Sequence, residues 1–130
     1  MTAIYLDSSA IVKLAVSEPE SKALRRYLRT RRPLVSSALA RTEVMRALLD
    51  KGESARAAGR RTLANLDLLR IDKRVLDVAG GLQPFELRTL DAIHLATAQR
   101  LGEDLGRLCT YDVRMCGAAE ALGMAVIAPS

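Results

Sequence analysis

Aromatic residues are scarce in this chain: its 130 residues include no tryptophan, one phenylalanine and three tyrosines. Aliphatic side chains must therefore fill the core. Proteins that bind single-stranded nucleic acids often stack successive bases on exposed aromatic rings. The scarcity of aromatic residues argues against a binding platform of that kind.

Long hydrophobic runs are also lacking. A membrane-spanning helix needs about 20 predominantly apolar residues, whereas the apolar run AIVKLAV near the start is short and is interrupted by Lys13. The opening MTAIYLD has no basic residues of the kind that begin a secretory signal. These features predict a cytoplasmic protein.

Cysteine and histidine are too few for a structural zinc site, which takes four such ligands. The chain has two cysteines, Cys109 and Cys116, and a single histidine, His94. The cysteines are not spaced as a zinc-binding CxxC pair. A disulfide between them is conceivable, but in a reducing cytosol two small buried hydrophobic residues are the better interpretation.

Arginine, by contrast, is abundant, and it outnumbers lysine by 16 to 4 in a chain of formal net charge +5. The planar guanidinium suits phosphate groups, so the composition favours a polyanionic partner such as nucleic acid. A coding bias toward arginine would give the same excess. The length and the hydrophobic content of 49% predict one globular domain over residues 1–130.

Short apolar strands alternate with helical segments along the chain. This alternation predicts an α/β fold with a mainly parallel central sheet covered by helices on both faces, in three α/β/α layers. The expected strands are 3–6, 33–37, 68–72, 106–112 and 124–129, and the expected helices are 8–16, 19–32, 38–52, 54–69, 73–82, 88–102 and 113–123.

Two aspartates lie at the carboxyl ends of expected strands, where open parallel sheets bind their ligands. Asp7 follows the first strand and Asp112 closes the strand RLCTYD. Taken singly, each is more simply interpreted as a helix cap. That interpretation is weaker for Asp7, because Ser8 or Ser9 could cap the first helix instead.

Two further acids lie on expected helices. In TLDAIHLATA (89–98), helical spacing puts Asp91 on a packed face or at its border, although an acid in a first helical turn also favours the helix dipole. Spacing alone predicts that Glu43 is solvated. His94 is three residues from Asp91 and is interpreted as a hydrogen-bonded packing residue.

Several carboxylates cannot all stay ionised in one cleft without a cation. A hard divalent ion with oxygen ligands, Mg²⁺ or Mn²⁺, resolves this. Such an ion lowers the pKa of bound water and stabilises charge on a phosphoryl oxygen. Together with the basic composition, the acids therefore suggest cleavage of phosphodiesters.

Four stretches resemble the PIN-domain family, and most closely its VapC-type toxins of bacterial toxin–antitoxin pairs. They are YLDSSAIVKL, the Glu in the helix after the second strand, LDAIHLATA, and TYD near the end. The likeness covers essentially the whole chain, including the closing AAEALGMAVIAP. It implies a compact α/β/α fold and a metal-dependent ribonuclease.

The resemblance also implies roles for particular residues. The four family acids correspond to Asp7, Glu43, Asp91 and Asp112, so the likeness makes Glu43 a site residue where spacing did not. Asp7, Asp91 and Asp112 are expected to hold Mg²⁺ or Mn²⁺.

Further expectations concern the surroundings of these acids. Ser9 and Thr110 are expected to hydrogen-bond carboxylates or water, and Arg41, Arg46 and Arg114 are possible phosphate contacts. Met115 stands where relatives often have an aromatic residue, a difference that concerns packing.

The implied partners are an RNA substrate, a second copy of the chain in a homodimer, and a small antitoxin that occupies the acidic groove.

Two other functions fit parts of the pattern. An aspartyl phosphatase would need a second Asp two residues after Asp7, where this chain has Ser9. A basic RNA-binding module without catalytic activity remains the alternative. Its binding would weaken steeply with salt and would need no metal.

Overall fold

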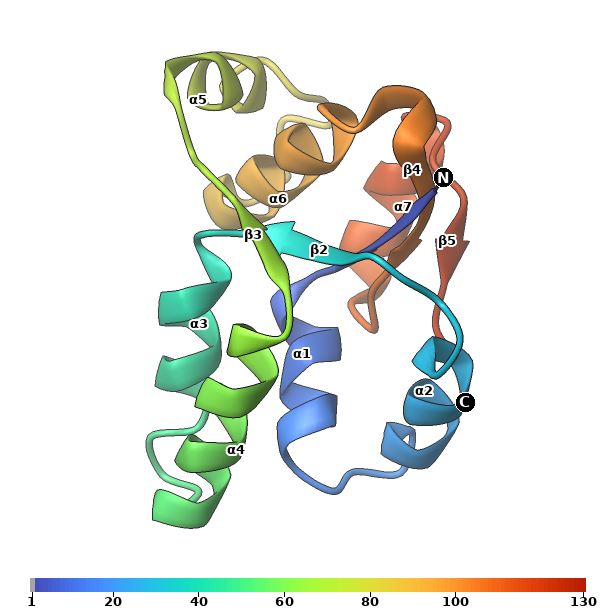
Figure 1. Cartoon of the computed structure of the whole chain (residues 1–130). Helices are drawn as coiled ribbons and strands as arrows, with labels where there is room; N and C mark the ends of the chain where they lie inside the picture. The colour runs from blue at the N-terminus through green and yellow to red at the C-terminus, as the bar shows by residue number, and fades with distance from the viewer. Residues whose placement is uncertain (1) are drawn as a thin grey trace.

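The computed structural model describes residues 2–130, so Met1 of the expected domain lies outside the described residues. Over that range the chain forms five strands, seven α-helices and one 3-10 turn (Figure 1). The strands are β1 (Ala3–Leu6), β2 (Leu34–Ser37), β3 (Asp67–Leu69), β4 (Leu105–Cys109) and β5 (Val126–Ile127). The helices are α1 (Ser8–Ala15), α2 (Ser21–Leu28), α3 (Ala40–Ala47), α4 (Glu53–Ala64), α5 (Lys73–Ala79), α6 (Thr89–Gln99) and α7 (Val113–Ala121), with the turn η1 at Gly102–Asp104.

The five strands form one sheet in the order β3-β2-β1-β4-β5. All four pairings are parallel, which confirms the prediction of a parallel sheet. The central strand β1 pairs with β2 on one side and with β4, about a hundred residues later in the chain, on the other. Strands β2 and β3 lie on one side of β1, and β4 and β5 lie on the other. The boundary between β1 and β4 is therefore a topological switch point, where open α/β sheets bind ligands.

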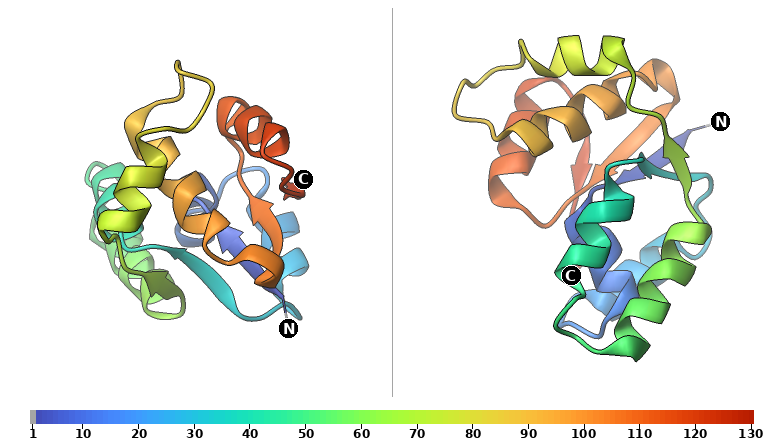
Figure 2. Two further views of the ribbon diagram at one scale, coloured as in Figure 1. Left: turned by 90° about the horizontal axis from the view of Figure 1, so that it is seen from above. Right: turned by 90° about the vertical axis from the view of Figure 1, so that its left-hand side faces the viewer.

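Helices cover both faces of the sheet, so the three-layer prediction is confirmed (Figures 1 and 2). The side chains of β1 alternate between the faces, as the period of a strand requires. Ile4 and Leu6 pack with residues of α1, α2, α3 and α4, whereas Tyr5 packs with residues of α6 and α7. Every residue of β1 is buried, so the strand belongs to two hydrophobic layers at once.

Several helices are shorter than their sequence pattern predicted. The expected helix 19–32 is regular only over Ser21–Leu28, and the expected helix 38–52 only over Ala40–Ala47. Gly52, at φ 94°, then reverses the chain into α4. A positive φ is accessible to glycine at little cost. The turn η1 was not predicted from the sequence.

Two other expectations are tested directly by the fold. Cys109 is buried, Cys116 is partly buried, and both are free thiols, which rules out the disulfide between them. None of the helices in residues 2–130 is long and apolar enough to cross a membrane; the longest, α4, has 12 residues.

Candidate functional site

Four acidic side chains lie near the carboxyl-terminal edge of the sheet. Asp7 directly follows β1, and Asp112 follows the adjacent strand β4 by three residues. Glu43 is in α3, the helix after β2, and Asp91 is in the first turn of α6. Residues that are far apart in sequence are brought to one edge because β1, β2 and β4 are parallel neighbours.

Asp7 is a buried carboxylate with only 3% of its surface exposed. Its Oδ1 accepts a hydrogen bond from the backbone N–H of Ala10, at 3.0 Å, and another from Ser9 Oγ, at 2.6 Å. Its Oδ2 accepts a hydrogen bond from Thr110 Oγ1. Asp7 itself is the N-cap of α1, so the expectation that Ser8 or Ser9 caps this helix is wrong. Because the Asp7 carboxylate accepts from the backbone N–H of Ala10 at the start of the helix, the Ser9 hydroxyl is not needed as a cap. It donates to the Asp7 carboxylate instead.

Burial raises the pKa of Asp7, because the charged form is poorly solvated inside the protein. The hydrogen bonds from Ser9, Thr110 and Ala10 act in the opposite direction but do not outweigh burial. Burial therefore makes the charge of Asp7 less favourable than it is in water, and a bound cation would offset this cost.

The end of β4 is joined to Asp7 through the same two hydroxyl groups. Thr110 Oγ1 accepts from the backbone N–H of Asp112 at 3.1 Å, and Ser9 Oγ accepts from that of Tyr111 at 3.1 Å. Ser9 and Thr110 thus each connect Asp7 to the segment that carries Asp112. The expectation that both contact a carboxylate agrees with this geometry.

Asp112 caps α7 with one oxygen and binds an arginine with the other. Its Oδ1 accepts from the backbone N–H groups of Arg114 and Met115, and its Oδ2 lies 2.9 Å from Arg88 Nη2. Met115 is buried in the core, as expected for a packing residue.

The same guanidinium also holds Asp91. Arg88 Nε lies 3.0 Å from Asp91 Oδ2, so one arginine spans two carboxylates from different elements of the fold. The side chain of Asp91 is 14% exposed, that of Asp112 29%, and that of Arg88 59%. Asp91 is therefore tolerated on a largely buried helix in part because a cation neutralises it.

Glu43 is partly buried and hydrogen-bonded, so the prediction of a solvated side chain from helical spacing is wrong. Ser8 Oγ donates to Glu43 Oε1 at 2.5 Å, and His94 Nε2 lies 2.6 Å from the same oxygen. Burial by itself would raise the pKa of Glu43, but the hydrogen bonds from His94 and Ser8 lower it overall. Glu43 is thus held as a carboxylate.

His94 connects Glu43 to the core. The ring is 1% exposed, and its Nδ1 lies 2.8 Å from the hydroxyl of Tyr5. All of these contacts are satisfied when Tyr5 donates to Nδ1 and Nε2–H donates to Glu43. Burial raises the pKa of Tyr5, so its hydroxyl keeps the proton that this arrangement requires. The interpretation of His94 as a hydrogen-bonded packing residue agrees with these contacts, which also orient Glu43.

The donor set at this edge suits a hard divalent cation, because it consists of carboxylate and hydroxyl oxygens. Asp91 and Asp112 already converge on one cationic group, the guanidinium of Arg88. Among residues 2–130, however, no three Asp, Glu, His or Cys side chains are placed to hold a metal ion as they stand. The residues fit a metal in type and location, and the Oδ2 atoms of Asp91 and Asp112 already contact Arg88.

The three arginines expected near phosphate are all exposed. Arg114 contacts an acid of the site through its backbone N–H, which donates to Asp112. Arg114 lines a cavity of about 390 Å³ together with Arg88, Asp91 and Val113. Arg41 and Arg46 lie on α3 near Glu43 in sequence. Arg114 therefore shares a surface depression with Asp91, an acid of the site.

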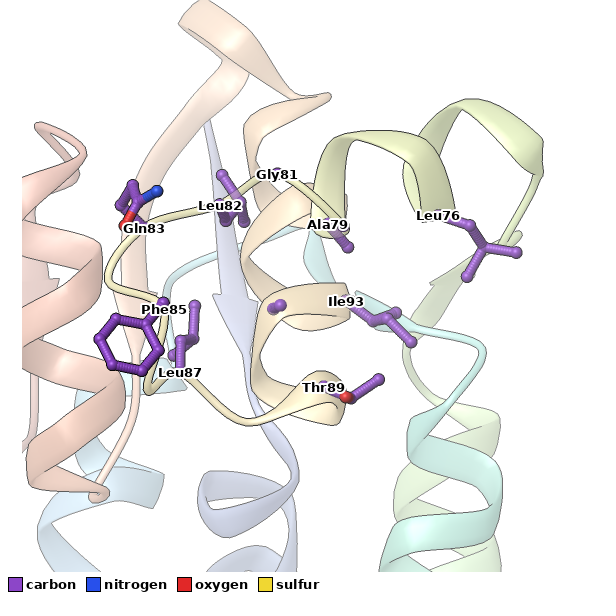
Figure 3. A pocket seen from close by; sticks show the side chains of 11 residues that line it. Leu76, Ala79, Gly81, Leu82, Gln83, Phe85, Leu87, Thr89 and Ile93 are labelled. Atoms are coloured by element: carbon purple, nitrogen blue, oxygen red, sulfur yellow. The ribbon is translucent and has the colours of Figure 1, made fainter.

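Another cavity, of about 350 Å³, lies between α5, the segment 80–88 and α6 (Figure 3). Its lining includes Leu76, Leu82, Phe85 and Ile93 and contains no acidic or basic residue. It therefore offers no groups for metal or phosphate chemistry, and the acidic edge is the better candidate.

Three contact residues of the site were not identified from the sequence: Arg88, Ser8 and Tyr5. Arg88 had a detectable signal, because it precedes Asp91 by three residues on one helical face, a spacing that places opposite charges side by side. Ser8 and Tyr5 had none, since their contacts with Glu43 and His94 join elements that are distant in sequence.

Comparison with known proteins places the chain in a family. The PIN domain family matches residues 4–121. Ribonuclease VapC46 of Mycobacterium tuberculosis is 86% identical over 100% of both chains. The crystal structure of M. tuberculosis VapC20, described as a sarcin-ricin loop cleaving toxin, superposes with a TM-score of 0.76 at 16% identity, covering 97% of this chain and 99% of that one.

A toxin–antitoxin complex from Klebsiella pneumoniae contains a chain that superposes with a TM-score of 0.73 at 22% identity, with 98% of each chain covered. At these low sequence identities the two solved structures support only the fold of this chain. The family match and the 86% identity show the family to which it belongs. The chain therefore belongs to the PIN-domain family, as a member of its VapC type.

Proposed function

We propose that this chain is a metal-dependent endoribonuclease and the toxin of a toxin–antitoxin pair. The observation that carries the proposal is that Asp91 and Asp112 both bind the guanidinium of Arg88. The hydroxyl of Thr110 also joins the Asp7 carboxylate to the backbone N–H of Asp112. The name Ribonuclease of the 86% identical relative supports RNA as the substrate.

Asp7, Asp91 and Asp112 are the residues that would hold Mg²⁺ or Mn²⁺. Such an ion supplies an activated water at neutral pH and neutralises charge on a phosphate oxygen. Ser9 and Thr110 fix the rotamer of Asp7 by donating to its two oxygens. Because burial disfavours the charge on Asp7, binding of a cation and ionisation of Asp7 support each other.

Glu43 completes the negative charge of the site and orients water at its edge. Ser8 and His94 both contact Oε1, so neither of these contacts uses Oε2. Hydrogen bonds to the carboxylate form keep Glu43 ionised and able to accept a hydrogen bond from water. Arg41, Arg46 and Arg114 are exposed at or near this edge and are proposed to bind RNA phosphates.

The proposed protein partner is a small antitoxin that places a basic side chain against the acids. Support comes from the Klebsiella pneumoniae neighbour, which is a toxin–antitoxin complex, and from the acids themselves, which already bind a guanidinium. The chain is further proposed to form a homodimer and to act in the cytoplasm, where its RNA substrate is found.

The test is RNA cleavage by purified, antitoxin-free protein, with Mg²⁺, with Mn²⁺ and with EDTA. The decisive variant is Asp7→Asn, which removes a buried charge at the site. Its matched control is Asp50→Asn, which removes the same charge from a side chain that is 83% exposed. We expect metal-dependent cleavage by the wild type and by Asp50→Asn, and none by Asp7→Asn.

A basic RNA-binding module predicts a different pattern. RNA would be retained in a filter-binding assay without metal, would be released steeply by salt, and would be bound as well or better by Asp7→Asn. Equal cleavage by Asp7→Asn and wild type would refute the catalytic role of the acidic edge.

A further inference from the structure

Arg88 lies between two acids of the site, Asp91 and Asp112, and contacts both. Its Nε and Nη2 groups, which share one edge of the guanidinium, each donate to an Oδ2 atom, of Asp91 at 3.0 Å and of Asp112 at 2.9 Å. A guanidinium edge binds two oxygens that face the same point. Both oxygens belong to acids that the proposed function assigns to a metal ion.

The surroundings of Arg88 allow its side chain to leave. It is 59% exposed and lies at the N-cap of α6, at the end of the irregular segment 80–88. Its own side chain makes no capping hydrogen bond to the helix. The adjoining cavity of about 390 Å³, which is lined by Arg88, Asp91, Glu86 and Arg114, gives the guanidinium space to move into.

The backbone at Asp91 and Asp112 is held independently of Arg88. Asp112 Oδ1 caps α7 through two backbone N–H groups, and Asp91 belongs to the regular helix α6. Loss of the guanidinium therefore leaves both acids in place, now repelling each other and free to accept a different cation.

We propose that Arg88 is the built-in counter-ion of Asp91 and Asp112, and that a divalent cation binds these acids by displacing its guanidinium. Arg88 thereby sets the metal affinity of the site. This inference rests on the proposed function, since it concerns the same acids. It adds a determinant of metal affinity within the toxin chain itself, separate from any antitoxin.

The test is calorimetric titration of the metal-free full-length protein with Mn²⁺, which reads metal binding rather than RNA cleavage. Removal of Arg88 in Arg88→Gln abolishes two competing ion pairs. Each partly exposed ion pair changes an equilibrium constant by a few-fold. Because two competing ion pairs are lost, we expect Mn²⁺ to bind about tenfold more tightly to Arg88→Gln than to wild type.

Two further variants separate displacement from a general change in charge. Arg114→Gln removes the same charge from the same cavity without breaking a bond to either acid, and should bind Mn²⁺ within about threefold of wild type. Arg88→Lys keeps the charge but lacks the two-pronged edge, so its affinity should lie between those of wild type and Arg88→Gln. Because Arg88→Lys keeps the charge at this position, it can replace Arg88→Gln in the Mn²⁺ titration if Arg88→Gln folds poorly.

The outcomes separate this inference from the proposed function. Equal or weaker Mn²⁺ binding by Arg88→Gln, with measurable binding by wild type, overturns the inference and leaves metal dependence standing. An equal gain in affinity in Arg114→Gln also overturns it. Failure of both wild type and Arg88→Gln to bind Mn²⁺ overturns the inference together with the metal dependence.

Discussion

Replacement of His94 by leucine tests how much the buried contacts behind Glu43 stabilise the fold. His94 is 1% exposed and joins Tyr5 in β1 to Glu43 in α3. Leucine is apolar and of similar size, so His94→Leu removes both hydrogen bonds while filling most of the space. The expected result is a folded protein of lower stability.

The magnitude follows from the burial of the two partners. A buried polar group left without a partner costs about 1–3 kcal/mol. The Tyr5 hydroxyl is fully buried, but it lies close enough to Ser36 and Thr97 to bond to them, which reduces its share. Glu43 has a side chain that is 22% exposed and can be rehydrated in part. We therefore expect His94→Leu to cost about 2 kcal/mol, or roughly 8 °C in Tm for a chain of this size.

Urea denaturation in EDTA measures this cost without any contribution from metal. His94→Gln is the matched control, because its amide can keep one of the two contacts, and it should cost less than His94→Leu. Tyr5→Phe should be destabilising in the wild-type background and less destabilising in the His94→Leu background, since its contact with His94 is already gone. A His94→Leu protein within about 0.5 kcal/mol of wild type would refute the reasoning.

Two further predictions concern charge and packing. Burial raises the pKa of Asp7 above its unfolded value, so its contribution to stability is fully present below the unfolded pKa of about 4 and is lost as the pH rises through the folded pKa. In EDTA, the free energy of unfolding of wild type minus that of Asp7→Asn should therefore fall from about pH 4 to pH 7; a difference that stays constant contradicts this. Gly59→Val should destabilise by about 1–3 kcal/mol, because a Cβ at Gly59 would lie 2.5 Å from Cδ1 of the buried Leu48. Gly117→Ala in α7, where no described atom lies within 4 Å of the added Cβ, should instead stabilise the protein by about 0.5–1 kcal/mol. Urea denaturation measures both changes in the free energy of unfolding, and the same sign for Gly59→Val and Gly117→Ala would rule out this steric account.

The layer architecture could be predicted because its signals are local. Apolar strands such as Ala3–Leu6 are marked by composition, and a strand followed directly by an acid and a helix places that acid at the carboxyl edge of a parallel sheet. Asp7 and Asp112 lie there. The sequence also indicated that Asp91 borders a packed face, because helical periodicity relates residues of one element to each other.

Periodicity carries no information about which elements pack together, and this limited the description of the site. Helical spacing puts Glu43 outside the main apolar face of its own helix, yet Ser8 of α1 and His94 of α6 hydrogen-bond to it. The resemblance to a family predicts that Glu43 is a site residue, whereas helical spacing predicted a solvated side chain. The structure shows that Asp7 caps α1 and that the same carboxylate also contacts the hydroxyl groups of Ser9 and Thr110.

The sequence by itself determined the order of strands and helices, the types of acid at the strand ends and the basic character of the chain. The tertiary structure alone decided that one arginine neutralises Asp91 and Asp112, and that Tyr5 and His94 lie behind Glu43. The physical reason is that hydrogen bonds and ion pairs act over about 3 Å. Partners separated by 24 to 89 residues meet only after the sheet has aligned its parallel strands and the helices have packed on both of its faces.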